Sequence, residues 1–194
     1  MFSNFALQPW VAILDLSDEE LIERFREQGN HSSLDALVRR HLPRVRALIY
    51  PLVGRSQTVD DLTQETFLRA IRSLDSFKGS SRFGTWLARI AINVVRDHHR
   101  SARRRVQINT TPEIEVVAEC PAPEDRVRDE ERDSKIHSAI LELPEAMREA
   151  VSLVCIQGYS PSDAAEITAS NLATVYWRIH QSRKRLKEKL ADYL

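Results

Sequence analysis

The sequence predicts an all-α protein made of two small helical domains that are joined by a flexible acidic linker. Apolar residues recur at three- and four-residue spacing along most of the 194 residues, which is typical of amphipathic helices. No segment alternates apolar and polar residues as a half-buried strand does. Helical periodicity lapses after residue 105, where prolines and acidic residues accumulate. The chain therefore divides into an N-terminal extension over residues 1–16, a domain over 17–105, a linker over 106–130 and a second domain over 131–194.

The first domain begins with recognisable helix boundaries. Ser17 and Glu20 are spaced as a capping box at the start of one helix, and Gly29 is placed to end it. A long amphipathic helix follows over residues 34–52, and we expect it to kink near Pro43 because proline cannot complete the helical hydrogen bonds.

A third helix is expected to begin at Thr58, with a cap at Asp61. One of its faces is largely polar, and its members are Asp61, Gln64, Glu65, Leu68 and Arg72. The pattern alone leaves two interpretations open. The face is either solvated, or it binds a protein partner that carries basic residues.

The fourth helix contains the stretch "FGTWLARIAINVVRDHHR", which starts apolar and ends basic. Its apolar side includes Phe83 and Trp86, whereas residues 96–105 hold five basic residues and one acidic residue. A basic row of this kind binds phosphates through the release of counterions. It is also typical of a solvated helix end, where cations complement the helix dipole. The periodicity does not decide between the two.

The linker is marked by its charge and by its prolines. Residues 113–133 contain nine acidic and three basic residues, a local net charge of −6. Composition alone favours a solvated acidic spacer.

The second domain is predicted to contain a helix-turn-helix. Pro144 can open one helix and Gly158 can close it. Ser160 and Asp163 then form a capping box for a short helix, which a longer basic helix follows over residues 172–190. Its candidate base-reading positions are Ala173, Thr174, Tyr176, Trp177, Arg178 and Gln181. Tyr176 and Trp177 are alternatively core residues, although adjacent residues cannot both point inward.

Composition excludes several classes of function. The five glycines form no phosphate-binding loop, and the two cysteines, Cys120 and Cys155, match no metal-binding spacing but fit a reducing cytoplasm. We therefore expect no catalytic, cofactor or metal site, and no segment inserts into a membrane. The 28 basic and 28 acidic residues cancel, so binding to nucleic acid depends on local patches.

Taken together, these segments resemble the extracytoplasmic-function (ECF) sigma factors of bacterial RNA polymerase. The stretch "VDDLTQETFLRAIRSLDSFKGSSRFGTWLARIAINVVRDHHR" is similar to region two of that family, and "LPEAMREAVSLVCIQGYSPSDAAEITASNLATVYWRIHQSRKRLKEKL" is more loosely similar to region four. The similarity covers about residues 17–105 and 130–192. It implies a cytoplasmic protein, not an enzyme, that binds core RNA polymerase and directs promoter-specific initiation by recognising the −10 and −35 elements and helping to melt the −10 region.

The resemblance also implies roles for individual residues. The surface for the clamp helices of the polymerase β′ subunit would comprise Asp61, Gln64, Glu65 and Leu68. The −10 reader, which holds a flipped base, would comprise Phe77, Lys78, Ser80, Arg82, Arg89, Asn93, Arg96 and Arg100. The −35 reader would comprise Thr174, Tyr176, Trp177, Arg178, Gln181 and Arg183. Trp86 is then expected in the core.

The chain departs from the family pattern in the −35 reader. Ala173 stands where the family usually has glycine, and Tyr176 and Trp177 stand where it has a basic residue and a small one. We therefore expect either an altered −35 sequence or a −35 element that matters less. The resemblance further implies contact with the polymerase β subunit, an acidic linker that mimics RNA phosphates in the RNA exit path, and a separately encoded anti-sigma factor.

Two other classes of function stay open at this point. A helix-turn-helix regulator would use only the C-terminal domain and would have no sigma role. A nuclease built around the adjacent His98 and His99 would lose activity on chelation.

Overall fold

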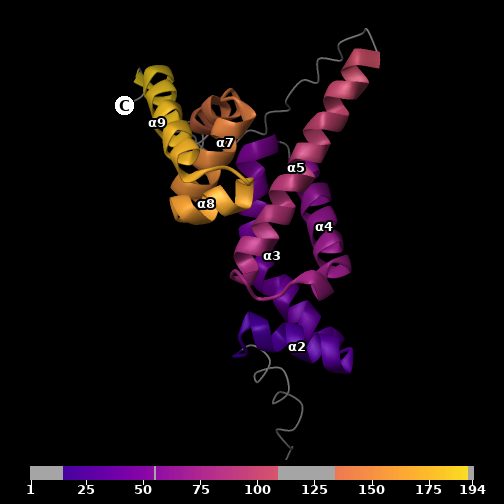
Figure 1. Cartoon of the computed structure of the whole chain (residues 1–194). Helices are drawn as coiled ribbons and strands as arrows, with labels where there is room; N and C mark the ends of the chain where they lie inside the picture. The colour runs from indigo at the N-terminus through magenta and orange to yellow at the C-terminus, as the bar shows by residue number, and fades with distance from the viewer. Residues whose placement is uncertain (1–14, 55, 109–133, 192–194) are drawn as a thin grey trace, which may run out of the picture.

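In the computed structural model, which describes residues 15–54, 56–108 and 134–191, all regular secondary structure is helical (Figure 1). The predicted all-α class is therefore confirmed. The N-terminal extension and the linker lie almost wholly outside the described residues. We call residues 15–108 the N-terminal domain and residues 134–191 the C-terminal domain.

The N-terminal domain consists of four helices and one short turn of helix. The helices are α2 (Asp18–Gln28), α3 (His31–Val53), α4 (Ser56–Arg72) and α5 (Phe83–Ile108), and a 3-10 turn (Leu74–Ser76) follows α4. The capping box at Ser17 is present, and Gly29 ends α2 with a left-handed φ of 61°. The predicted start of α4 at Thr58 was wrong, because the helix already begins at Ser56. Helix α3 continues through Pro43 to Val53.

The core of the N-terminal domain lies between α3, α4 and α5. Its fully buried residues include Leu48, Ile49 and Ile92. An aromatic cluster closes one end, where the ring centroid of Trp86 lies 5.3 Å from that of Phe77 and 5.5 Å from that of Phe83. Trp86 thus packs against the core as expected.

The C-terminal domain contains the predicted helix-turn-helix. A helix over residues 134–141 leads to α7 (Glu145–Val151), which continues as a π-helical turn (Ser152–Ile156), and α8 (Pro161–Thr168) and α9 (Leu172–Lys189) form the motif. The predicted capping box at Ser160 is present. Leu172 is 44% exposed. It is the first residue of α9, directly after the N-cap Asn171, so it precedes the turns that pack against α7 and α8.

The two domains pack against each other along α3 and α5 (Figure 1). One cluster of buried apolar residues spans both domains and includes Ala164 and Ile167 of α8 as well as Val95 of α5. The Tyr159 hydroxyl donates a hydrogen bond of 3.2 Å to the carbonyl of Gly84. The described part of the chain is therefore a single packed body rather than two separated domains.

Gly54 offers a direct test of this packing. Gly29 and Gly54 both end helices with positive φ, so alanine at either position costs about 1–2 kcal/mol of backbone strain. Only at Gly54 would the added Cβ meet the other domain, at 2.6 Å from Cδ1 of Leu141. We expect Gly54→Ala to lower the melting temperature more than Gly29→Ala does. In the Gly54→Ala protein, a further Leu141→Ala substitution should remove the part of the destabilisation that comes from contact between these two positions. A double-mutant cycle of thermal unfolding measures that part. Equal losses for the two glycine variants would contradict the observed packing.

Candidate nucleic-acid interface

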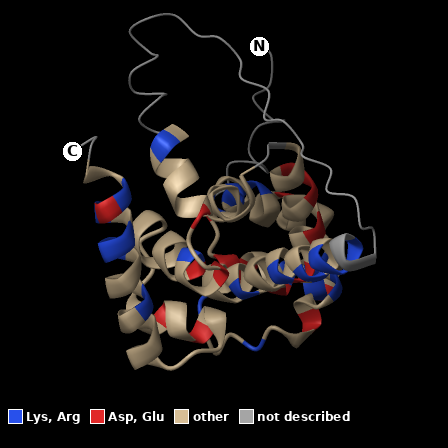
Figure 2. Ribbon diagram, turned by 90° about the horizontal axis from the view of Figure 1, so that it is seen from above, with Lys and Arg blue, Asp and Glu red and all other residues tan. Residues whose placement is uncertain are grey.

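Exposed basic residues follow the outer side of α5. Figure 2 shows Lys and Arg along the outer half of this helix, which ends at the right of the view, and on the helix that leads to the C-terminus. Arg89 and Asn93 are exposed, and Arg89 forms no ion pair within the described residues. The side chain of Arg100 is 65% exposed and lies 3.6 Å from a carboxylate oxygen of Asp97. These guanidinium groups are available to phosphates.

Helix α2 holds the turn before α5 in place. Arg26 of α2 donates a hydrogen bond of 2.7 Å to the carbonyl of Phe77 and another to the carbonyl of Leu74. The Phe77 side chain is buried, whereas Lys78 and Arg82 are exposed, as is Ser80. Phe77 therefore anchors the turn, and the residues after it are presented to solvent. The role of Arg26 was not predictable from the sequence, because Arg26 lies 51 residues from Phe77.

Arg96 lies in a different environment from Arg89 and Arg100. Its Nε and Nη2 atoms donate to Oε1 and Oε2 of Glu149, each at 2.7 Å, and Nη2 also lies 3.3 Å from the carbonyl oxygen of Thr168. Hydrogen bonding to Glu149 raises the pKa of Arg96. Sequence reasoning missed Glu149. The available signal was an acidic residue four positions before the apolar Leu153, one helical turn away on a side that is buried.

Helix α9 presents an aromatic and basic surface. Tyr176 and Trp177 are each 56% exposed, so neither is a core residue. The N-cap Asn171 accepts a hydrogen bond of 2.7 Å from the Thr174 backbone. Arg178 donates one of 2.8 Å to the Ser170 hydroxyl. Gln181 is partly buried, and Arg183 is exposed and lies near the thiol of Cys155.

An apolar groove of about 440 Å³ runs between α3 and α4. Leu42 and Leu68 line it, and Leu68 is 42% exposed. Gln64 also lines the groove, and Asp61 is exposed on the same helix. We call this surface the α3–α4 groove.

Glu65, which the sequence placed on the same face of α4, is partly occupied by an internal contact. It accepts a hydrogen bond of 2.7 Å from Arg69, and Arg69 donates another of 2.7 Å to Asp97 of α5. Glu65 thus helps to join α4 to α5.

The adjacent histidines lack the surroundings of a metal site. The ring centroids of His98 and His99 are 5.8 Å apart. No group of three or more His, Cys, Asp or Glu side chains suited to a metal ion occurs in the described part of the chain. Among the same residues, no helix is both long and apolar enough to cross a bilayer.

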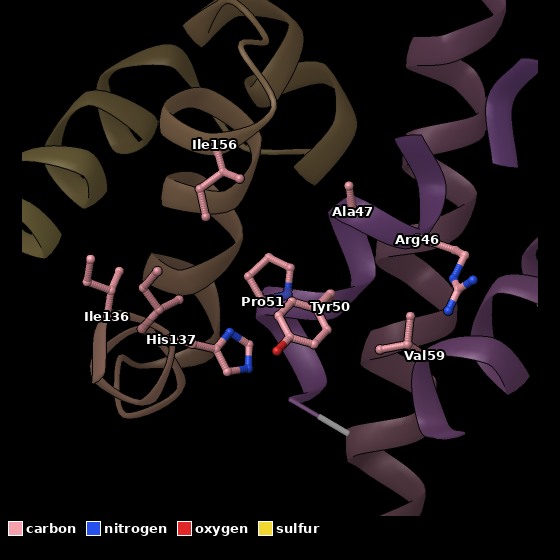
Figure 3. Close-up of a pocket in the computed structure, with 9 residues that line it drawn as sticks. Arg46, Ala47, Tyr50, Pro51, Val59, Ile136, His137 and Ile156 are labelled. Atoms are coloured by element: carbon pink, nitrogen blue, oxygen red, sulfur yellow. The ribbon is translucent and has the colours of Figure 1, made fainter. Parts of the chain in front are cut away.

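Two histidines lie at the contact between the domains. His137 stacks on Tyr50 with ring centroids 4.3 Å apart, and burial lowers its pKa, with a smaller contribution from Arg148 (Figure 3). Burial also lowers the pKa of His99, and Arg148 and His98 act in the same direction. Glu145 and the backbone of Leu52 oppose this effect at His99.

Acidification is therefore expected to weaken the contact between the domains. Both histidines bind a proton less readily here than in water, so the contact keeps its full stability above pH 6.5 and loses it as the pH falls below that value. The measurement is hydrogen exchange of Leu52 and Leu153 amides between neutral and mildly acidic pH. The double variant His99→Gln/His137→Gln should lose the pH dependence of this hydrogen exchange. His180→Gln should keep it, because His180 is exposed on α9. An unchanged pH dependence in the double variant would contradict this assignment.

Family comparisons agree with this geometry. The model of sigma-70 region 2 matches residues 37–105, and the model of sigma-70 region 4 matches residues 133–186. The chain belongs to the ECF class of the sigma-70 family. The RNA polymerase sigma-H factor of Pseudomonas aeruginosa is 32% identical to this sigma factor over 190 residues, which covers 91% of this chain and 95% of the relative. The ECF RNA polymerase sigma-E factor of Haemophilus influenzae is 31% identical over 188 residues, which covers 90% of this chain and 96% of the relative.

Solved structures show the same fold. The sigma factor RpoE from Bartonella quintana, determined in complex with the anti-sigma factor NepR, superposes with a TM-score of 0.67 at 31% identity and covers 79% of this chain and 93% of its own. CnrH, determined in complex with the cytosolic domain of CnrY, superposes with a TM-score of 0.66 at 26% identity. The match covers 91% of this chain and 99% of CnrH. The sigma factor therefore acts in transcription initiation.

Proposed function

We propose that this sigma factor binds core RNA polymerase through the α3–α4 groove and directs initiation at promoters that carry specific −10 and −35 elements. The observation that carries the proposal is the groove itself. Its apolar lining extends from the buried Phe67 to the exposed Leu42 and Leu68, and exposed apolar side chains at this place have no use in a regulator that works with its C-terminal domain alone. Gln64 lines the groove, and the exposed Asp61 lies three residues before it on α4, which suits a helical partner with basic residues, as expected of the β′ clamp helices.

The proposed −10 reader is the turn over residues 77–82 together with the exposed side of α5. Melted DNA presents phosphates and unstacked bases, and proteins bind such strands with basic grooves and pockets that accept single bases. Lys78 and Arg82 on the turn and Arg89 and Arg100 on the helix supply the charge. Arg26 keeps the turn in a fixed shape, which would favour a pocket for a flipped base.

The proposed −35 reader is the exposed face of α9. Thr174 and Arg178 lie in the first turns of the helix, where a helix-turn-helix meets the major groove. The exposed Tyr176 and Trp177 bring bulky apolar rings to this surface, which supports an altered −35 preference. Gln181 and Arg183 extend the same surface.

Other partners follow from the same role. The C-terminal domain is proposed to contact the polymerase β subunit, and the protein works without catalysing a reaction, in the cytoplasm, where the polymerase is. An anti-sigma factor is a further proposed partner, supported by the similarity to RpoE and CnrH, each solved with a partner of its own. The acidic linker over residues 106–130 stays a proposed RNA mimic.

The experiment that tests the proposal reconstitutes the sigma factor with sigma-free core polymerase of its host and fragmented host DNA. Sequencing the 5′ ends of the transcripts should reveal discrete starts that share a −10 motif, and alignment of the upstream DNA should reveal the −35 preference. Starts no more specific than those of core polymerase alone would instead favour the helix-turn-helix regulator.

A further inference from the structure

An acidic residue stands within the surface that is proposed to bind the phosphates of melted DNA. Asp97 comes four residues after Asn93 and three residues before Arg100 on α5, so the three residues share one side of the helix. The Asp97 side chain is 46% exposed. A carboxylate at such a place would ordinarily repel a phosphate and weaken the binding of DNA. The contacts that Asp97 makes decide its effect on this surface.

Each carboxylate oxygen of Asp97 faces an arginine. Nη1 of Arg69, on α4, donates a hydrogen bond of 2.7 Å to Oδ2 of Asp97. The other oxygen, Oδ1, lies 3.6 Å from Nη1 of Arg100. The carboxylate therefore lies between two guanidinium groups, one from each helix, and these compensate its negative charge.

Arg69 is itself held in place by a second carboxylate. Its Nε atom donates a hydrogen bond of 2.7 Å to Oε1 of Glu65, which lies one turn earlier on α4. Hydrogen bonding to Asp97 and, to a smaller extent, to Glu65 raises the pKa of Arg69. The Arg69 guanidinium is thus fixed on two sides, and it in turn fixes the Asp97 carboxylate against α4.

Arg100 can bind a phosphate while it faces Asp97. Its side chain is 65% exposed, and Nη1 is the atom that approaches the carboxylate. A guanidinium has five N–H donors, so the donors on its other side remain available for a phosphate. An unrestrained arginine side chain loses much rotational freedom when it binds, and the contact with Asp97 reduces that loss in advance.

We propose that Asp97, held by Arg69, is a positioning residue of the −10 reader and orients Arg100 toward a phosphate of the melted strand. The inference rests on the proposed function, because it assumes that Arg100 binds this strand. Asp97 acts through Arg100 rather than by touching the DNA. A negative charge thus strengthens the binding of an anion through the cation that it orients, and Arg69 offsets the repulsion between Asp97 and the phosphate.

The test uses the sign of the effect, because repulsion and orientation predict opposite results. Asp97→Asn keeps the shape of the side chain and removes its charge. A carboxylate that only repelled phosphates would make this variant bind DNA more tightly than the parent, whereas a carboxylate that orients Arg100 makes it bind more weakly. The measurement titrates a fluorescein-labelled promoter fragment, melted over the −10 element by mismatches, with the preassembled complex of sigma factor and core polymerase.

We expect Asp97→Asn to weaken binding of this fragment about threefold or more. In a protein that already carries Arg100→Ala, the same substitution should cause no weakening, because the residue that Asp97 positions is absent. This double-mutant cycle separates positioning from a general loss of stability. Asp97→Asn should also lower the slope of log affinity against log salt by up to about 0.7, the value of one phosphate contact on a single strand.

Asp35→Asn is the matched control. The Asp35 side chain lies on α3, is 43% exposed and accepts a hydrogen bond of 2.9 Å from Arg39, so it is also an exposed aspartate paired with an arginine. This variant should bind the fragment as the parent does, and weakening equal to that of Asp97→Asn would overturn the inference. A circular-dichroism melt of each variant establishes that its helices are intact.

The outcomes separate this inference from the proposed function. Binding by Asp97→Asn that is as tight as that of the parent or tighter, or a loss that persists beside Arg100→Ala, would overturn the positioning role. Either result leaves the sigma role standing if the parent complex prefers this fragment to one whose −10 element is scrambled. A parent complex without that preference would instead count against the proposed function.

Discussion

Replacing Leu68 with glutamate is expected to weaken binding to core RNA polymerase by about 30- to 1000-fold, which corresponds to the loss of a central interface residue. Leu68 is 42% exposed and lines the α3–α4 groove, so the substitution removes little packing inside the protein. In the complex the same position would place a charge against an apolar surface, where its desolvation is costly. The measurement is a titration of labelled core polymerase with each protein.

Leu172→Glu is the control for this prediction. Leu172 is a leucine of similar exposure, 44%, and lies at the start of α9, away from the groove. Its variant should lose far less affinity for polymerase than Leu68→Glu does, although the C-terminal domain is proposed to contact the β subunit. Equal losses for Leu68→Glu and Leu172→Glu would show that the groove is not the docking surface.

The double variant Arg89→Ala/Arg100→Ala is expected to bind melted promoter DNA much more weakly when assembled with polymerase. Each arginine that contacts a phosphate of a single strand contributes about 0.7 to the slope of log affinity against log salt. The double variant should therefore lower that slope by about 1.4 and should weaken binding most at low salt. Both residues are exposed, so the helix itself should be unaffected.

The control variant removes the same number of positive charges from a different part of the surface. Arg24 of α2 and Arg39 of α3 are exposed, and neither belongs to the proposed −10 reader. Arg24→Ala/Arg39→Ala also removes two positive charges and should leave the salt slope of the polymerase complex unchanged. If both double variants lowered the slope equally, the effect would come from net charge rather than from α5.

Features set by neighbouring residues were predictable from the sequence. The capping boxes at Ser17 and Ser160 depend on side chains three residues apart, and the all-α class depends on apolar spacing within single helices. The start of α4 at Ser56 was missed, because the more conspicuous signals at Thr58 and Asp61 lie inside the helix.

Contacts between distant segments were not predictable. The pair between Arg96 and Glu149 joins residues that lie 53 positions apart, and the hydrogen bond from Arg26 to Phe77 spans 51. Periodicity placed Arg96 on a basic helix side, and it carries no information on which carboxylate faces that side. The sequence identified a candidate DNA-binding residue, and only the folded chain shows that the C-terminal domain occupies it.

One measurement tests most directly whether a single chain reads both promoter elements. A photo-crosslinking amino acid is placed at Lys78 or at Trp177, and the sigma factor is assembled with core polymerase on a promoter found by transcript mapping. We expect Lys78 to crosslink to the non-template strand of the −10 element and Trp177 to crosslink to the −35 duplex of the same DNA. Crosslinks from Trp177 alone, with none from Lys78 in the presence of polymerase, would contradict the account and favour a regulator that uses only its C-terminal domain.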